Sequence, residues 1–423
     1  MGIAALRALS ASVAALLALG VAGCGGGDNG DGGIGAVPPQ VGGVVFIYSS
    51  LRGAPMREKD SMVKAIRLAY DSAGGHAGPF TVKWQDLDRT TSASGLWNEE
   101  QVAADARTAA RNSRTVGYIG EFDSEATKTS IPILNAAEIS SISPASAYVG
   151  LTTNEDSGGP KGEPGSNYPT KERTFVRLVP RDTVQASALV ATMKKDGCKK
   201  VALADDGSTY GESLGRLVHR EAKDSGVAVL KTITFTSSTS AQTSATGFEE
   251  QGANCFLLAA GSATSDAARL YRTVANTLGT KARLYGTDVL CHQRSTPAAG
   301  LSASVRRRFA CVLPTVPVTS SPAASQFLKA YRRRWGDGTP TPYAVYAYEA
   351  MRLYLDTIES LGVLGSSKTA VAAALNPTGE RRSALGNYTI DTNGDTTSTA
   401  YGLYRVDGRG VLRYSETVRP AVR

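Results

Sequence analysis

The chain has 423 residues, of which 42% are hydrophobic and 20% charged, and its formal net charge is +8. This composition is typical of folded globular proteins and excludes a long disordered or fibrous chain, while the length predicts two or three domains. The positive charge is spread along the sequence and only 7% of the residues are aromatic, so we expect no nucleic-acid partner.

The first 23 residues have the features of a secretory signal. Arg7 precedes an apolar stretch, Ala8–Val21, which is shorter than the roughly 20 residues of a spanning helix. The ending Val-Ala-Gly-Cys at 21–24 resembles the bacterial lipobox, in which the cysteine becomes the lipidated first residue; an incidental cysteine at an ordinary cleavage site is the alternative. We expect Cys24 to anchor the protein to the outer leaflet of the cell membrane, with 24–40 as a flexible tether.

Short β-branched runs then alternate with stretches of helical period, a pattern typical of α/β proteins with parallel sheets. The first series predicts strands over 41–49, 79–88, 115–120 and 139–143, and helices around Met62–Tyr70 and over 97–112 and 124–137. Residues 153–173 are rich in Gly, Pro and charge and predict a long exposed loop.

A second series of the same kind follows. It predicts helices over 183–195, 212–224, 243–252 and 263–278, and strands over 199–206, 227–235, 255–261 and 283–288. The remainder predicts a strand over 309–316, helices over 325–335, 343–362 and 368–375, and a β section over 386–414. We therefore expect two Rossmann-like lobes with parallel sheets.

Four cysteines follow Cys24, in a chain whose signal sends it to a compartment where disulfides persist. Cys198 and Cys255 lie at the beginnings of strands that are neighbours in the usual doubly wound order, and Cys291 and Cys311 flank a short segment. We predict the pairs Cys198–Cys255 and Cys291–Cys311. The sequence has neither CxxC nor Cys/His zinc spacing, and we expect no metal and no cofactor.

One pentapeptide suggests an enzyme. Residues 211–215 match the G-x-S-x-G pattern of serine hydrolases. In such enzymes the serine lies on the turn directly after a strand, whereas Ser213 should already lie inside the next helix. His219 is on that same helix, and His292 is the only downstream candidate base. We expect a helix serine and no catalysis.

Short polar residues stand at the carboxyl ends of the predicted strands, where open α/β sheets bind ligands. They are Ser49-Ser50, Asp123-Ser124 and 143–147 in the first half, and Thr209-Tyr210-Gly211, Gly261-Ser262 and Asp288 in the second. The helix start at Ser124 offers free N–H groups to a carboxylate, and Asp288 offers an acid. Each residue taken alone could equally be a helix cap or a turn former.

With this layout, five stretches resemble the extracytoplasmic binding proteins of branched-chain amino-acid ABC transporters, the leucine/isoleucine/valine-binding family with the type I periplasmic binding fold. They are YIGEFDSEATKTSIPILNAAEISSISPASAYVGLT (118–152), VRLVPRDTVQASALVATM (176–193), VALADDGSTYGESLG (201–215), LYGTD (284–288) and GNYTIDTNGDTT (386–397).

The resemblance covers about residues 43–415 and implies two lobes that close on a small solute through a hinge of three crossing strands. The crossings should fall near Arg177, Thr315 and Asn387. They divide the chain into a lobe I of 41–177 and 316–386 and a lobe II of 178–315 and 387–423.

The resemblance also implies a ligand-binding set. It assigns the solute carboxylate to Ser124 and to the turn that contains Ser146 and Ala147, which replace the usual Ala and Thr of the family. It aligns Tyr210 with a ligand-facing tyrosine and Asp288 with the acid that pairs with the solute ammonium. We add Ser50 and Ser262, which follow strands of the two halves.

We therefore expect a monomeric lipoprotein that captures a small zwitterionic solute, a branched-chain or related amino acid, and delivers it to an ABC permease. The alternative is a sensing module of the same fold for amides, urea or small acids, although nothing after Tyr414 could span a bilayer. A serine hydrolase is the third interpretation.

Overall fold

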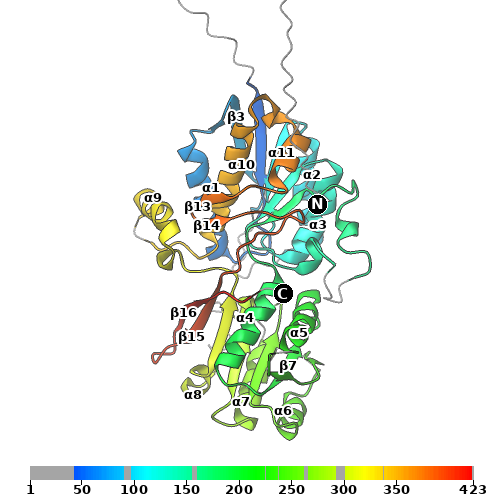
Figure 1. The fold of residues 1–423 in the computed structure, drawn as a ribbon, viewed down its shortest axis with the longest axis vertical. Helices are drawn as coiled ribbons and strands as arrows, with labels where there is room; N and C mark the ends of the chain where they lie inside the picture. The colour runs from blue at the N-terminus through cyan, green and yellow to red at the C-terminus, as the bar shows by residue number, and fades with distance from the viewer. Residues whose placement is uncertain are drawn as a thin grey trace, which may run out of the picture. The chain divides into compact units, whose positions relative to one another are not determined.

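The computed structural model describes residues 42–89, 97–154, 160–223, 225–236, 238–261, 265–291, 301–336 and 338–421. Contacts divide the chain after Gln40, and the unit from Val41 to Arg423 holds all described residues. The predicted signal and tether, with Cys24, lie outside them. Within the described unit the strands form two large sheets covered by helices (Figure 1).

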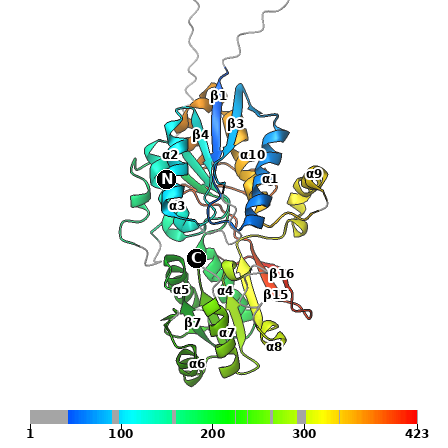
Figure 2. The same cartoon turned by 180° about the vertical axis from the view of Figure 1, so that it is seen from behind.

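The first sheet has six strands in the order β2-β3-β1-β4-β5-β6, and only the β2–β3 pair is antiparallel. Figure 2 shows β1 between β3 and β4. The strands are β1 (Val44–Ser49), β2 (His76–Ala77), β3 (Phe80–Asp86), β4 (Thr115–Ile119), β5 (Ser140–Ser143) and β6 (Phe175–Arg177). The helices between these strands are α1 (Met56–Ser72), α2 (Glu99–Arg111) and α3 (Ser124–Ala136). Three helices from later in the chain join them: α9 (Ser325–Trp335), α10 (Ala344–Ser360) and α11 (Lys368–Leu375).

The second sheet has the order β16-β15-β12-β11-β10-β7-β8, with β9 also paired to β7. Its strands are β7 (Lys200–Asp205), β8 (Ala228–Val229), β9 (Ile233–Thr234), β10 (Cys255–Ala259), β11 (Arg283–Gly286), β12 (Phe309–Leu313), β15 (Tyr401–Val406) and β16 (Leu412–Val418). Its helices are α4 (Asp182–Lys195), α5 (Thr209–Ala222), α6 (Ala241–Glu250), α7 (Ser265–Thr277) and α8 (Ala303–Arg306). A separate hairpin joins β13 (Arg381–Ser383) to β14 (Gly386–Tyr388).

The burial of these elements follows from their sequences. Every residue of β4, TVGYI, is buried, as expected of a central parallel strand with helices on both faces. Helix α1 buries the stripe Met62, Ala65, Ile66 and Ala69 at helical spacing, and α10 packs along α1. The predicted α/β fold with two mainly parallel sheets is confirmed.

The chain passes between the two groups of elements three times. The first connection runs from β6 to α4, the second follows β12, and the third leads from β14 to β15. These connections lie near the predicted crossings at Arg177, Thr315 and Asn387, while the proposed lobe boundaries stay a prediction.

Several stretches differ from the sequence-based expectation. The short elements β2, α8 and β13 lie where no element was predicted. The run 227–235 forms two short strands, β8 and β9, in place of one. Val229 pairs with Val201 and Ile233 with Ala204, so an advance of four residues along this edge lies opposite an advance of three residues along β7. One extra residue of this kind is a bulge, which interrupts an edge strand. The three-residue strand β6 lies in a stretch to which the residue pattern assigned no element, although the resemblance implies a crossing strand near Arg177.

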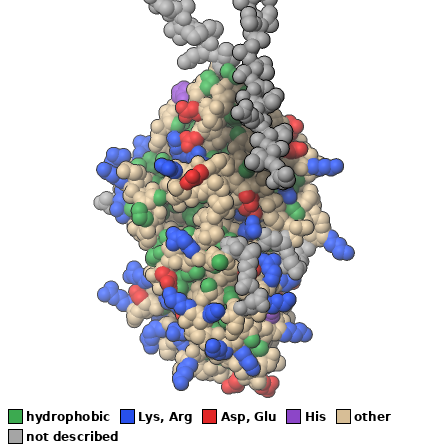
Figure 3. Space-filling view, viewed as in Figure 1, with side chains coloured by type: hydrophobic (Ala, Val, Ile, Leu, Met, Phe, Trp, Pro, Cys, Tyr) green, Lys and Arg blue, Asp and Glu red, His purple; other side chains and the backbone are tan. Residues whose placement is uncertain are grey.

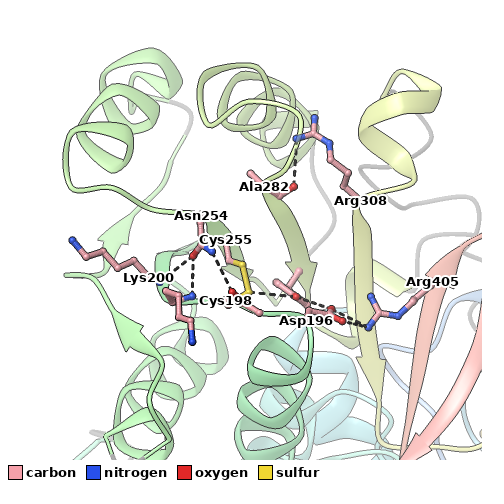
Figure 4. The surroundings of a disulfide bond; sticks show 11 residues. Asp196, Cys198, Lys200, Asn254, Cys255, Ala282, Arg308 and Arg405 are labelled. Carbon is pink, nitrogen blue, oxygen red and sulfur yellow. Dashed lines mark hydrogen bonds and ion pairs between the residues drawn. A yellow bond between two sulfur atoms is a disulfide. The ribbon is translucent and has the colours of Figure 1, made fainter.

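Both predicted disulfides are present. The Cα atoms of Cys198 and Cys255 are 5.8 Å apart, and those of Cys291 and Cys311 are 5.7 Å apart. Figure 4 shows the first bridge beside Asn254, whose Oδ1 accepts the N–H groups of residues 199 and 200. The first bridge ties the segment just before β7 to β10, and the second ties the 3-10 helix after β11 to β12.

Lys and Arg side chains are dispersed over the face drawn in Figure 3. Within the described ranges, no helix is long and apolar enough to cross a membrane. The same part of the chain contains no group of three or more His, Cys, Asp or Glu side chains that could hold a metal ion.

Candidate functional site

The site begins at the N-terminus of α3, directly after β4. Asp123 caps this helix, because its Oδ1 accepts the N–H groups of Glu125 (2.8 Å) and Ala126 (3.1 Å). Ser124 is the first helical residue, and its Oγ accepts the N–H of Tyr148 at 3.3 Å. Since a serine hydroxyl has one proton to donate, Ser124 keeps a donor at the positive end of a helix dipole.

The turn after β5, Ser143–Tyr148, is named here the solute turn. Ser143 Oγ accepts the N–H groups of Ala145 (3.2 Å) and Ser146 (2.9 Å) and so shapes the turn. Ser146 is buried, and its Oγ lies 2.6 Å from Thr127 Oγ1 and near the carbonyl groups that precede α3. The hydroxyl of Ser146 is therefore directed into the protein, and what the turn offers a solute is its backbone.

Ala147 is the residue of the turn with a backbone donor left over. Its carbonyl accepts the N–H of Asp182 at 2.9 Å, whereas its own N–H has no hydrogen-bond partner among the described residues. Together with the hydroxyl of Ser124, this N–H gives the first-sheet side of the site two donors suited to a carboxylate.

Tyr210 and Asp288 meet on the side of the second sheet. Asp288 follows β11 directly, and Tyr210 lies in the first turn of α5, after β7. The Tyr210 hydroxyl is 2.8 Å from Asp288 Oδ1 and 3.0 Å from Gln185 Oε1. Burial, followed by the negative charges of Asp288 and Asp182, raises the pKa of Tyr210 well above its usual value, so this hydroxyl stays protonated.

Asp182, the first residue of α4, is a site residue that the sequence reasoning missed. Its side chain is fully buried, and neither carboxylate oxygen has a hydrogen-bond partner among the described residues. Burial and then the charge of Asp288 raise the pKa of Asp182 to about 8, against the opposing effect of Arg177. A buried acid without a partner beside a second acid favours a positively charged ligand group.

Aromatic residues lie close to these acids. The negative charge of Asp288 contributes to the raised pKa values of Tyr343, just before α10, and Tyr401, the first residue of β15, although burial is the larger cause in both. Tyr343 also packs edge-on against Phe122, with ring centroids 5.0 Å apart. Phe122 precedes α3, so apolar rings extend from the acidic side to the Ser124 side.

The other predicted site residues lie as follows. Ser50 is buried, and its Oγ donates to Asp105 Oδ2 at 3.0 Å, within a network that also holds Arg52. Its role in solute binding stays a prediction. Ser262 lies outside the described residues.

The surroundings of Ser213 do not support the hydrolase interpretation. This serine is fully buried within α5, and its hydroxyl has no hydrogen-bond partner among the described residues. His219 Nε2 lies 2.9 Å from Thr232 Oγ1, and His292 lies outside the described residues. An active serine would need an adjacent base and an exposed hydroxyl.

Five of the predicted residues, Ser124, Ser146, Ala147, Tyr210 and Asp288, lie along one line of contacts. It runs from Ser124 through the solute turn to Asp182, then along α4 to Gln185, and on through Tyr210 to Asp288. Hydrogen-bond donors stand at one end and Asp288 at the other, with the carboxyl group of Asp182 between them. This arrangement can hold a small molecule with an anionic and a cationic group, and it contains no nucleophile placed beside a base.

The fold and this site define a two-sheet α/β protein that binds small solutes at the carboxyl ends of its strands. The sequence model of the periplasmic binding protein family matches residues 51–410, and the chain belongs to this family. The family binds solutes without transforming them, which confirms the prediction that the chain is not an enzyme. A search of curated protein sequences finds no match.

Several solved structures share the fold. An ABC transporter substrate-binding protein from Desulfitobacterium hafniense, in complex with Leu, is 17% identical with a TM-score of 0.69, covering 88% of this chain and 100% of that one. The leucine-binding protein LivK from Thermotoga maritima is 18% identical with a TM-score of 0.70, covering 89% and 99%. A solute-binding protein from Rhodopseudomonas palustris, in complex with p-hydroxybenzoic acid, is 16% identical with a TM-score of 0.69, covering 89% and 97%.

Proposed function

We propose that the protein captures a small amino acid outside the cytoplasm and delivers it to an ABC permease. The observation that carries this proposal is the pairing of the Tyr210–Asp288 contact and the buried carboxylate of Asp182 with the donors at Ser124 and Ala147. A zwitterion matches the two ends, since its ammonium balances the acids and its carboxylate accepts from the donors.

The ligands of the structural neighbours support a solute with an anionic group. The proposal that the solute also has a cationic group rests on this chain's own residues. Leu, Ile, benzoate and hydroxybenzoates, the ligands of those neighbours, all carry a carboxylate. Only the amino acids among them carry an ammonium group. The acids Asp182 and Asp288 favour an amino acid over a benzoate, because an ammonium can pair with them whereas a benzoate offers them no cation.

The aromatic residues favour an apolar side chain on the solute. Tyr343 feels the charge of Asp288 and packs against Phe122, which precedes α3, and apolar contact with rings is a large part of small-ligand affinity. A branched-chain or related amino acid fits this lining. Amides and urea do not carry both charges. The sensing interpretation therefore predicts that the protein binds neutral solutes and not amino acids.

Calorimetric titration of the purified protein tests the proposal directly. The panel is L-leucine, L-isoleucine, L-alanine, L-leucinamide, 4-hydroxybenzoate and urea. We expect a branched-chain amino acid to bind at least tenfold more tightly than L-leucinamide or 4-hydroxybenzoate, because each of these lacks one charged group. Binding of urea or of the benzoate alone would refute the amino-acid proposal and leave the binding fold standing.

We further propose that the protein is a monomer held at the membrane by lipid on Cys24. The support is the lipobox-like ending at 21–24 and the polar, glycine-rich stretch that follows it. Each buried CH₂ of an acyl chain contributes about 0.8 kcal/mol to membrane attachment. Mass spectrometry of the native mature N-terminus should show a diacylglyceryl cysteine at position 24; an unmodified N-terminus at any other residue would contradict the anchor.

A further inference from the structure

The carbonyl groups of the solute turn are held by the first connection between the sheets. Arg177 Nη1 donates to the carbonyl oxygens of Ser146 (3.3 Å) and Tyr148 (2.8 Å). Between them, the carbonyl of Ala147 accepts the N–H of Asp182 at 2.9 Å. Three consecutive carbonyls are thus fixed by residues of a single connection.

These hydrogen bonds determine the direction of the Ala147 N–H, the donor proposed for the solute carboxylate. The peptide bond between Ser146 and Ala147 is trans, and a planar trans peptide directs its C=O and its N–H to opposite sides. Because Arg177 holds the carbonyl of Ser146, the N–H of Ala147 points away from the guanidinium. A cation at the carbonyl also polarises the peptide group, which strengthens its N–H as a donor.

Arg177 is itself fixed by the third connection. Its side chain is fully buried, and its Nε lies 2.7 Å from Asp395 Oδ1. Its Nη2 donates to Thr152 Oγ1 at 2.6 Å, and Asp395 Oδ2 in turn accepts from Thr152 at 3.1 Å and pairs with Arg181 at 3.0 Å. Both the orientation and the charge balance of Arg177 therefore depend on Asp395.

The backbone brings these two connections into direct contact. The N–H of Arg177 donates to the carbonyl of Gly394 at 2.9 Å. Gly394 has φ +92°, and a Cβ at this position would lie 2.0 Å from the carbonyl oxygen of Phe175. A glycine is required for this close approach, so the chain is built to keep Asp395 beside Arg177.

We propose that Arg177, held by Asp395, is a positioning residue for the solute carboxylate: it aims and polarises the N–H of Ala147. The inference rests on the proposed function, since it requires a solute whose carboxylate reaches the solute turn. It adds that Arg177, on a connection between the two sheets, orients the donor for the solute carboxylate without touching the solute.

The test compares a carboxylate-bearing probe with the same molecule lacking that group. L-leucine and 3-methylbutylamine are titrated into the wild type, Arg177→Lys and Asp395→Asn. Asp196→Asn is the matched control, because Asp196 pairs with Arg405 at 2.8 Å elsewhere in the second sheet. We expect L-leucine to bind about tenfold more weakly, or worse, to the two variants, with the amine changed by less than about twofold and the control unchanged.

A general loosening of the protein would weaken both probes equally, and this result would overturn the proposal, as would unchanged binding of L-leucine. Asp395→Asn keeps the shape of the side chain and one oxygen acceptor, so it serves if Arg177→Lys does not fold. Selective loss of L-leucine binding in Asp395→Asn supports the proposal by itself.

A measurement without solute separates this proposal from the proposed function. In protein labelled with ¹⁵N-alanine, the amide proton of Ala147 should shift upfield in Arg177→Lys and Asp395→Asn, because its peptide loses polarisation, and should stay in place in Asp196→Asn. An unmoved resonance in both variants refutes the role of Arg177. If the resonance moves but the wild type binds neither probe, the role of Arg177 stands and the amino-acid proposal fails.

Discussion

Raising the pH from 6 to 8 should tighten the binding of an amino acid, because of Asp182. Burial and the neighbouring charge of Asp288 raise the pKa of Asp182 to about 8, so in the free protein its carboxyl group is protonated through most of this range. An ammonium favours the ionised form, and binding then releases a proton. The affinity can therefore rise by at most about tenfold per pH unit, or about 100-fold from pH 6 to pH 8.

The same group makes the stability of the free protein depend on pH in the opposite sense. The pKa of Asp182 is higher in the folded protein than the roughly 3.9 of an unfolded chain, so folding takes up a proton between these two values. The stabilisation is complete below about pH 4 and is lost as the pH rises towards 8. This group should lower the free energy of unfolding by up to about 1.4 kcal/mol per pH unit in that window.

Two measurements on the wild type and Asp182→Asn check this reasoning. Titration of L-leucine in buffers of different ionisation enthalpy gives the number of protons released, and urea unfolding at pH 5, 6, 7 and 8 gives the stability. Asp182→Asn should abolish the proton release on binding and should reduce the loss of stability between pH 5 and pH 8, to which other buried acids such as Asp86, whose pKa burial raises to about 6, also contribute. Asp196→Asn should leave both effects as they are in the wild type. Equal affinity at pH 6 and pH 8 with no proton release in the wild type would refute the assignment of Asp182 to the ammonium end.

Other substitutions should separate binding from catalysis and stability. Asp288→Ala should weaken amino-acid binding by about 30-fold or more, because cutting a buried charge pair on one side costs about 2–5 kcal/mol; Ser213→Ala should change affinity by less than about twofold, and calorimetry that found the reverse order would contradict the site. Replacing Cys291 and Cys311 together by serine should lower the free energy of unfolding by about 3 kcal/mol, because the bridge closes a loop of 20 residues, and denaturant unfolding with an unchanged midpoint would count against this.

The regular elements could be predicted because their patterns are local. The helices over 325–335 and 368–375 were predicted with the limits the structure shows, since their periodic apolar positions and flanking breakers lie within one short window. The division of 227–235 into two strands could not be predicted in this way, because the bulge depends on the register with β7. Sequence alone does not contain that register.

The site shows the same limit. Asp288 and Tyr210 are recognisable because each follows a predicted strand, and the structure places them in contact. Asp182 has the position of an ordinary acidic residue in the first turn of a helix, where the helix dipole favours it; its importance arises only when burial and Asp288 leave it without a partner. The side chain of Ser146 illustrates the converse, because its contact with Thr127 is a tertiary contact between the solute turn and helix α3.

The bridge between Cys291 and Cys311 also bears on how the site is presented. Asp288 and Cys291 are the two ends of one short 3-10 helix after β11, and the bridge fastens that helix to the neighbouring strand β12. Asp288, the acid proposed to pair with the solute ammonium, therefore stands on a covalently braced segment that has little freedom to lose when a solute binds. A braced segment preserves affinity, because a loose segment would lose part of the binding free energy in becoming ordered. Since the bridge needs oxidising conditions, the conditions outside the cytoplasm contribute to the affinity of the site.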